Sequence, residues 1–248
     1  KVAVFADITH LKELDRMKMD LISFVSHELK NPIGTLQGVC DLLPRRLPGA
    51  DEETARLFDI ARRQSARMRY LVQDFLDLSR IEAGQSLELE WSEIGDPAQV
   101  VQSALELTKP GGPEHTFETE VADDLGPFWA DRNKIESVLI NLVENATKYS
   151  PEGGTVTLRA FATEGDVVFE VQDQGIGIRE ADLPKLFRSF QRVHDSTFGR
   201  VSGTGVGLYI CRNLVEAHGG NIEVESTWGE GSTFRFNIPH YATPPSVQ

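Results

Sequence analysis

The sequence predicts a multidomain fold: an all-α helical hairpin that forms a dimeric four-helix bundle, followed by an α+β two-layer sandwich. Two observations predict this order. Up to residue 84, apolar residues recur at the three-and-four spacing of amphipathic helices along two long segments. From residue 86, shorter segments alternate between the two-residue period of strands and the helical period, which is typical of helices that cover one mixed sheet.

The first long helix is predicted from about residue 9 to residue 43, with a bend at Pro32, because proline cannot donate to the preceding turn. With a rotation of about 100° per residue, its apolar side chains fall on one stripe. They are Leu21, Val25, Leu29, Leu36, Val39 and Leu43. His27 falls roughly opposite the centre of that stripe, so it should lie on the polar face of the helix.

A turn is predicted at residues 44–51, which contain two prolines and a glycine, and a second helix at residues 52–83, ended by Gly84. The apolar residues of this helix recur at the same spacing: Leu57, Ile60, Ala61, Met68, Leu71, Phe75 and Leu78. One hairpin covers only one stripe of each helix, so a second copy that completes a four-helix bundle is favoured. The alternative is a hairpin packed against another part of the same chain.

The second part of the chain alternates strands and helices. Strands are predicted at residues 87–91, 115–121, 128–129, 155–161, 167–171, 222–225 and 233–238. Helices are predicted at residues 97–109, 131–148 and 207–218, the first of them capped by Asp96. We expect residues 85–95 to be a hinge, residues 96–240 the second domain, and residues 241–248 a disordered tail.

The charge balance limits the classes of function. The chain has 38 acidic and 25 basic residues, a formal net charge of −13. This balance argues against nucleic-acid binding, which requires a basic face, but it leaves room for a nucleotide site, which needs only a local arrangement of charge.

The two cysteines and the apolar runs bear on location. Cys40 and Cys211 match no metal-ligand spacing and are expected to be buried free thiols in a reducing compartment. No apolar run is long enough to span a bilayer. We therefore expect a cytoplasmic fragment without membrane contact of its own, and a sensor or membrane segment upstream is compatible with the sequence.

His27 is a candidate nucleophile. An exposed imidazole titrates near neutrality, so a good fraction is neutral at pH 7. Glu28 can hold one ring nitrogen as N–H and leave the other free to attack. A solvated surface pair is the alternative.

Asn141, Asn145 and Lys148 are spaced by four and three residues and should share one helix face. An amide oxygen is a hard ligand that suits Mg²⁺, and a neighbouring ammonium suits phosphate. A polar stripe that faces solvent is the alternative interpretation.

Two glycine-rich runs extend this candidate site. One directly follows a predicted strand and contains Asp173, Gly175 and Gly177. Glycines allow a close backbone approach to a flat ligand, and the carboxylate can accept from the amine of adenine. The other runs into a helix, whose first amides attract phosphate. It contains Gly203, Thr204, Gly205, Gly207 and Leu208.

In this order, the motifs resemble those of the sensor histidine kinases of two-component systems, over almost the whole chain. The run from Phe24 to Pro32 resembles the phosphoacceptor box of that family. The other boxes follow: residues 141–149 resemble the asparagine box, residues 173–177 and 203–207 the two glycine boxes, and residues 187–190 the phenylalanine box. The resemblance implies a dimerisation and histidine phosphotransfer hairpin at residues 9–84 and a GHKL-type (Bergerat) ATP-binding domain at residues 96–240. Residues 1–8 would be the end of an upstream sensor, similar to the last strand of a PAS domain, with its linker.

The resemblance implies a role for three residues of the first helix. His27 would take the γ-phosphoryl group of ATP and pass it to an aspartate on the receiver domain of a response regulator. Glu28 would orient or deprotonate the ring. Asn31 would position the water that hydrolyses the phospho-aspartate of the partner.

The resemblance also implies a set of residues around Mg²⁺ and ATP. Asn145 would be the magnesium ligand, with Asn141 as a helper. Lys148 would contact phosphate, Tyr149 would lie against adenine, and Asp173 would read the adenine amine. Residues 188–204 would form a mobile lid, from which Arg192 contacts phosphate. Two other functions stay open: a non-catalytic nucleotide-binding dimeric scaffold, and an ATP-driven clamp of the GHKL type.

Overall fold

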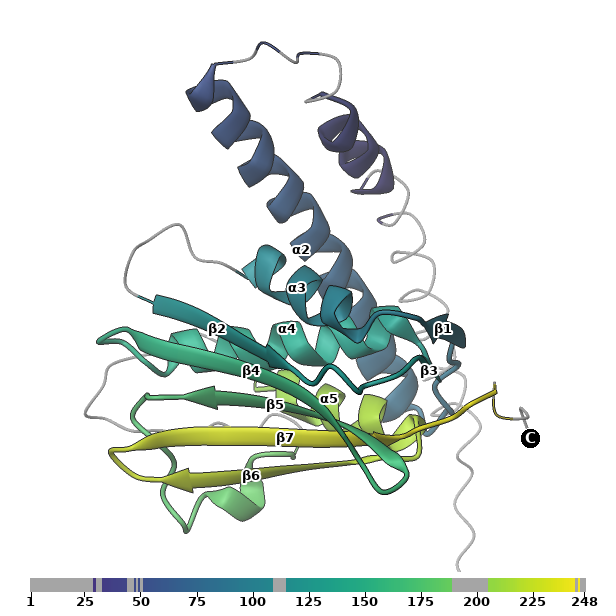
Figure 1. Ribbon diagram of the computed structural model, residues 1–248, viewed down its shortest axis with the longest axis vertical. Coiled ribbons are helices and arrows are strands. Elements are labelled where there is room, and N and C mark those ends of the chain that lie inside the picture. Colours follow the sequence, from purple (N-terminus) through teal and green to yellow (C-terminus); the bar gives the residue numbers. More distant parts are fainter. Residues whose placement is uncertain are drawn as a thin grey trace, which may run out of the picture. The chain divides into compact units, whose positions relative to one another are not determined.

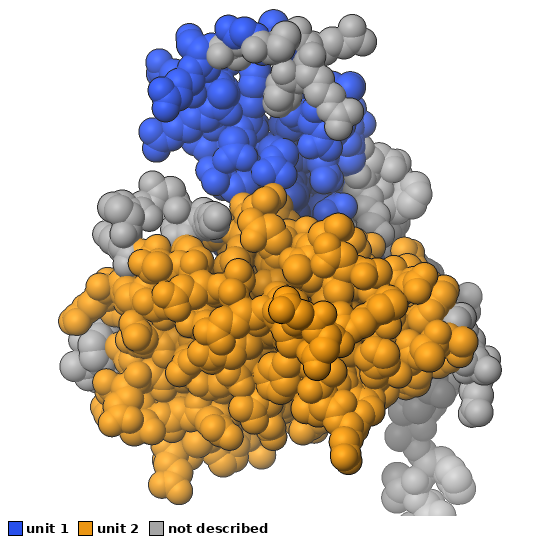
Figure 2. All heavy atoms as spheres, in the orientation of Figure 1, with its two compact units in different colours: residues 1–87 blue, residues 88–248 orange. Residues whose placement is uncertain are grey.

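The computed structural model describes residues 29, 33–43, 47, 49, 51–108, 115–188, 205–243 and 245. The chain divides into two compact units, residues 1–87 and residues 88–248, which Figure 2 colours separately. The predicted strand at the start of the chain and most of the first helix lie outside the described residues. No helix of the described ranges is long and apolar enough to cross a membrane. The predicted domain boundaries stay predictions.

The first unit contains the described end of the predicted first helix and the whole of the second. Residues 33–43 are helical, and α2 spans Glu52–Glu82. Asp51 caps α2 by accepting a hydrogen bond of 2.7 Å from the Thr54 amide, which satisfies one free N–H of the first turn. Gly84 follows the helix with φ of 67°, a left-handed conformation that ends helices and that glycine adopts without strain.

The hairpin buries only part of its apolar surface. Ile33, Cys40 and Ala66 are buried, and the Ser65 hydroxyl donates to the Ile33 carbonyl at 3.3 Å. Most of the predicted apolar stripe is exposed instead, with Leu36, Val39, Leu57, Ile60, Met68, Leu71 and Phe75 all more than a third accessible. A single hairpin therefore leaves an apolar face uncovered, as the spacing predicts.

The second unit is the predicted two-layer α+β fold. Its strands are β1 (Ser92–Ile94), β2 (His115–Val121), β3 (Phe128–Ala130), β4 (Gly154–Thr163), β5 (Asp166–Asp173), β6 (Asn221–Thr227) and β7 (Gly231–Pro239). Its helices are α3 (Pro97–Thr108), α4 (Arg132–Lys148) and α5 (Gly207–Ala217), with a short 3₁₀ helix, η1, at Leu183–Lys185. Five strands form a mixed sheet in the order β2-β4-β5-β7-β6, with β2 parallel to β4. The three α-helices lie on one face of this sheet (Figure 1).

Two details differ from the sequence prediction. β1 and β3 pair as a separate two-stranded sheet, so the described strands form two sheets rather than one. The predicted strand at residues 87–91 is wrong, because pairing begins only at Ser92. Glu90 instead donates its amide to the Asp131 carboxylate at 2.9 Å, and the Trp91 ring packs against His218. The alternating apolar residues Leu87, Leu89 and Trp91 are half-buried and the residues between them are exposed. The alternation therefore reflects burial of one side of the segment and not pairing with another strand.

α4 begins at a buried polar junction. Asp131 caps it by accepting from the Lys134 amide at 3.2 Å, and the Asp131 amide donates to His218 Nε2 at 3.1 Å. The other ring nitrogen of His218 contacts the Leu214 carbonyl at 2.7 Å. Burial lowers the pKa of His218 below its ordinary value, so the ring is neutral at pH 7. His218 thereby ties the first turn of α4 to the end of α5.

Both cysteines, Cys40 and Cys211, are buried and outside any disulfide, as predicted.

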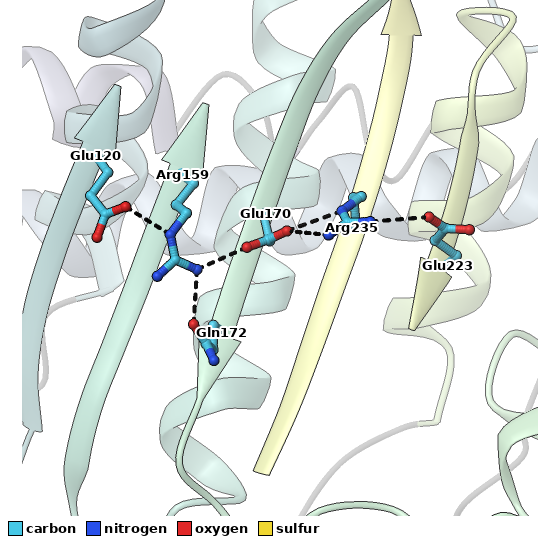
Figure 3. Close-up of polar contacts among 6 residues, drawn as sticks. All are labelled: Glu120, Arg159, Glu170, Gln172, Glu223 and Arg235. Atoms are coloured by element: carbon cyan, nitrogen blue, oxygen red, sulfur yellow. Dashed lines mark hydrogen bonds and ion pairs between the residues drawn. The ribbon is translucent and has the colours of Figure 1, made fainter. Parts of the chain in front are cut away.

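A row of alternating charges crosses the face of the sheet away from the helices (Figure 3). Glu120, Arg159, Glu170, Arg235 and Glu223 come from five adjacent strands and are direct cross-strand neighbours. At the centre, Glu170 accepts from Arg159 at 2.8 Å and from two nitrogens of Arg235 at 2.8 and 3.0 Å. Burial acts to raise the pKa of Glu170, but the hydrogen bonds from Arg235 and Arg159 outweigh it, and the pKa is lowered.

We expect Glu170→Gln to lower the free energy of unfolding by about 2 kcal/mol, because a buried charged acceptor of two arginines is lost. Glu120→Gln is the matched control, since that side chain is 58% exposed and its single ion pair contributes at most about 1 kcal/mol. Urea unfolding of both variants measures the difference. The pKa of the Glu170 carboxyl is lower in the folded state than in the unfolded state, so the stabilisation from Glu170 is present at neutral pH. This stabilisation should fade as the pH falls below the unfolded value of about 4.3 and through the lower folded value. Equal losses for both variants would contradict a central role of Glu170.

Candidate functional site

The C-terminal half of α4 carries a half-buried polar face. Asn141, Asn145 and Lys148 all lie on it, while Leu139 and Val143 on the opposite face are buried in the core. The Lys148 ammonium lies 5.0 Å from the centre of the Tyr149 ring. This face therefore presents two amide groups and one cation, and Tyr149, the residue after the helix, adds an aromatic ring beside that cation.

A buried carboxylate, that of Asp173, lies at the end of β5. Asp173 is 6% exposed, and its Oδ1 accepts from the Gly175 amide at 2.8 Å and the Ser232 amide at 3.2 Å. Burial raises the pKa of Asp173 above its ordinary value, and the two amide hydrogen bonds offset this only in part. Both hydrogen bonds from described residues end on Oδ1. Oδ2 is therefore the oxygen that can accept from a ligand.

The turn after Asp173 is held from two sides. The Ile176 amide donates to the Tyr149 carbonyl at 3.0 Å, which joins the turn to the end of α4. On the other side, the Gly229 amide donates to the Ile176 carbonyl at 2.8 Å, and the Ile178 amide donates to Ser226 Oγ at 2.8 Å. Two segments that are distant in sequence, the end of α4 and the end of β6 with the turn after it, thus fix the backbone of this turn.

Glycine is needed at two positions where these segments meet, and a third glycine packs closely against α4. A Cβ at Gly175 would collide with the Tyr149 carbonyl oxygen, and one at Gly177 with the Thr227 carbonyl oxygen. Gly177 also has φ of 66°, which side-chain-bearing residues rarely adopt. At the start of α5, a Cβ on Gly207 would meet Asn141 Oδ1. The first turn of α5 therefore lies directly against the asparagine face of α4.

The structure brings together one group of the predicted site residues. The group consists of Asn141, Asn145, Lys148, Tyr149, Asp173, Gly175, Gly177, Gly205, Gly207 and Leu208, on the face and the C-terminal end of α4, the end of β5 and the turn after it, and the start of α5 with the residue just before its N-cap. The others lie outside the described residues: His27, Glu28, Asn31, Arg192, Gly203 and Thr204. The same holds for residues 189–204 of the predicted lid. The roles of all these residues stay predictions.

Three serines that surround the same turn were not predicted from the sequence. Ser232 donates its amide to Asp173, Ser226 accepts from the turn, and Ser150 follows α4 at the point where the turn attaches. The first two belong to β7 and β6, and only the pairing of those strands with β5 places them here. Ser150 directly follows the predicted asparagine motif, so its position next to that motif could have marked it as a candidate site residue.

The fold and these contacts define a class of protein: a helical hairpin followed by a two-layer ATPase-type domain. Residues 17–84 match the family model of the His Kinase A (phospho-acceptor) domain. Residues 130–242 match that of the histidine kinase-, DNA gyrase B-, and HSP90-like ATPases.

Individual relatives agree with both matches. The sensor histidine kinase WalK of Bacillus subtilis is 33% identical over 242 residues, covering 96% of this chain and 39% of that protein. The sensor protein SrrB of Staphylococcus aureus is 30% identical over 249 residues, covering 96% of this chain and 41% of that protein. Full-length ShkA, crystallised with AMPPNP, has a TM-score of 0.61 at 27% identity, over 90% of this chain and 46% of that chain.

The chain belongs to the sensor histidine kinases of two-component systems. It spans less than half the length of the curated relatives named above.

Proposed function

We propose that this chain is an ATP-dependent protein-histidine kinase that phosphorylates itself on His27 and passes the phosphoryl group to an aspartate of a response regulator. One observation carries the proposal. The asparagine face of α4, the Asp173 turn and the first turn of α5 meet in one place, within a unit of the ATPase family that follows a phosphoacceptor-family hairpin.

The described residues fit ATP. Asp173 offers a buried carboxylate oxygen to the exocyclic amine of adenine, and Gly175 and Gly177 keep the backbone beside it free of side chains. Tyr149 supplies an aromatic face, and Lys148 a cation for phosphate. The first amides of α5 add a site that favours anions.

The same residues fit Mg²⁺ bound together with the nucleotide. The described residues contain no cluster of three histidine, cysteine or acidic side chains that would hold a metal alone. Mg²⁺ commonly takes one or two protein oxygens and completes its shell with phosphate and water. We assign the amide oxygen of Asn145 as that ligand, with Asn141 as a helper, and when bound the ion would neutralise phosphate charge.

Phosphoryl transfer needs positioning and charge neutralisation more than covalent help. The imidazole of His27 attacks the γ-phosphorus, a P–N bond forms, the bond to the β-phosphate oxygen breaks, and ADP leaves. Glu28 holds or accepts the proton of the other ring nitrogen. Since His27 and the nucleotide site belong to different domains, the hinge at residues 85–95 must let them meet.

The proposed active form is a homodimer. Leu57, Leu71 and Phe75 are each 48–59% exposed along one side of α2, and Leu36 and Val39 are exposed on the first helix. An uncovered apolar stripe on two adjacent helices matches the seam of a four-helix bundle. A second copy of the hairpin would cover it.

Incubation with γ-labelled ATP tests the proposed function. We expect label on the protein that is stable to base and released by acid, which is typical of a phosphohistidine. ATP turnover without such label would favour the GHKL clamp. Nucleotide binding without turnover or label would favour the non-catalytic scaffold.

We expect Asn31→Ala to spare self-labelling and to abolish the phosphatase action on a phosphorylated response regulator, because the amide is proposed to position the attacking water. The measurement compares the rate of label appearance on the kinase with the rate of phosphate release from the regulator. If both rates fall to the same extent, Asn31 has only a structural role.

A further inference from the structure

Ser150 carries a buried hydroxyl that makes no hydrogen bond to any described residue. The residue is 2% exposed. Its backbone, in contrast, is well held: the Ser150 carbonyl accepts from the Gly153 amide at 3.0 Å and contacts His115 Nε2 at 3.0 Å. Buried polar groups are almost always paired, so an unpaired hydroxyl in a fixed position points to a partner that arrives with a ligand.

The hydroxyl lies at the carboxylate of the candidate adenine site. The position that a Cβ of Gly175 would take lies 2.7 Å from Ser150 Oγ and 2.8 Å from Asp173 Oδ1. The Ser150 hydroxyl therefore lies beside the Asp173 carboxylate, and its distance from Oδ1 is within the span that a single bridging water covers.

The other two serines around this turn have structural roles. Ser226 Oγ accepts from the Ile178 amide and lies 2.8 Å from the Gly231 carbonyl oxygen, to which it can donate. The Ser226 and Ser232 hydroxyls also bond to each other at 3.0 Å. Asp173 Oδ1 is already held by two backbone amides. The Ser150 hydroxyl is therefore not required to shape the turn.

We propose that Ser150 determines base specificity in the ATP site: its hydroxyl donates, directly or through one water, to the ring nitrogen next to the amine that Asp173 accepts. This inference rests on the proposed function. Adenine presents a donor amine beside an acceptor nitrogen, whereas guanine presents an acceptor carbonyl beside a donor N–H. An acceptor carboxylate and a donor hydroxyl side by side match adenine and oppose guanine.

Calorimetry on the whole chain with Mg-ATP and with its 1-deaza analogue, in which that ring nitrogen is replaced by C–H, tests the inference. We expect the wild type to bind ATP about tenfold more tightly than the analogue, the effect of one hydrogen bond to a buried partner. Ser150→Ala should lower ATP affinity to that of the analogue and leave affinity for the analogue unchanged.

Two controls separate this role from a structural one. Ser150→Ala should keep or raise the urea midpoint of the free protein, because no hydrogen bond among the described residues is lost. Ser226→Ala should lower the midpoint and weaken both nucleotides equally. If Ser150→Ala leaves ATP affinity unchanged or weakens both nucleotides equally, the proposed role is wrong while the kinase proposal stands. If the wild type binds no Mg-ATP, the proposed function itself fails.

Discussion

Replacing His27 by glutamine is expected to reduce self-labelling from γ-labelled ATP to background while ATP binding is retained. Glutamine has no ring nitrogen that can form the P–N bond, so the nucleophile is lost. The proposed nucleotide site, in contrast, consists of α4, the turn after β5 and α5, all within the second unit. Labelling and calorimetry on the same preparation measure the two effects separately.

His240→Gln is the matched control for the nucleophile. His240 is an exposed histidine of the second unit, and the same substitution there should leave labelling at the wild-type level. Label that persists on His27→Gln, with the same stability to base as in the wild type, would refute the assignment of His27.

Replacing Asn145 by alanine is expected to abolish Mg-ATP binding without unfolding the chain. The substitution removes the proposed magnesium ligand, so we expect a loss greater than the roughly 10–100-fold that outer-shell changes cost in metal sites. The side chain is half-buried at the accessible edge of α4, and alanine is a good helix former. Calorimetry with Mg-ATP and circular dichroism during urea unfolding report the two quantities.

Asn213→Ala provides the control for a lost amide. Asn213 lies on α5 and donates to the Tyr209 carbonyl of its own helix at 2.8 Å. This variant should bind Mg-ATP as the wild type does. Unchanged nucleotide affinity in Asn145→Ala would remove Asn145 from the site, and parallel loss in both variants would indicate general damage to the domain.

Local sequence signals predicted most elements of the second unit. Asp131 is a favoured N-cap residue, and the structure starts α4 directly after it. Pro97 likewise begins α3, as expected for a residue that has no amide to satisfy. Each of these signals depends on neighbours within one turn, which a sequence displays directly.

Contacts between distant segments could not be predicted in the same way. Ser232 holds Asp173 across 59 residues of sequence, because β5 and β7 are adjacent in the sheet. The charge row around Glu170 depends on the register of five strands, and a shift of one residue would send its members to opposite faces. The sequence therefore predicted a carboxylate at the end of β5 but not the strand that orients it.

The most direct test of the central claim is to locate the phosphoryl group after incubation of the chain with Mg-ATP. Digestion at neutral to basic pH, which preserves phosphohistidine, followed by tandem mass spectrometry identifies the modified residue. Phosphorylation by the proposed mechanism predicts one phosphoryl group on the peptide that contains His27, on its imidazole ring. A phosphoryl group on a serine, threonine or aspartate, or ATP turnover with no modified peptide, would contradict it.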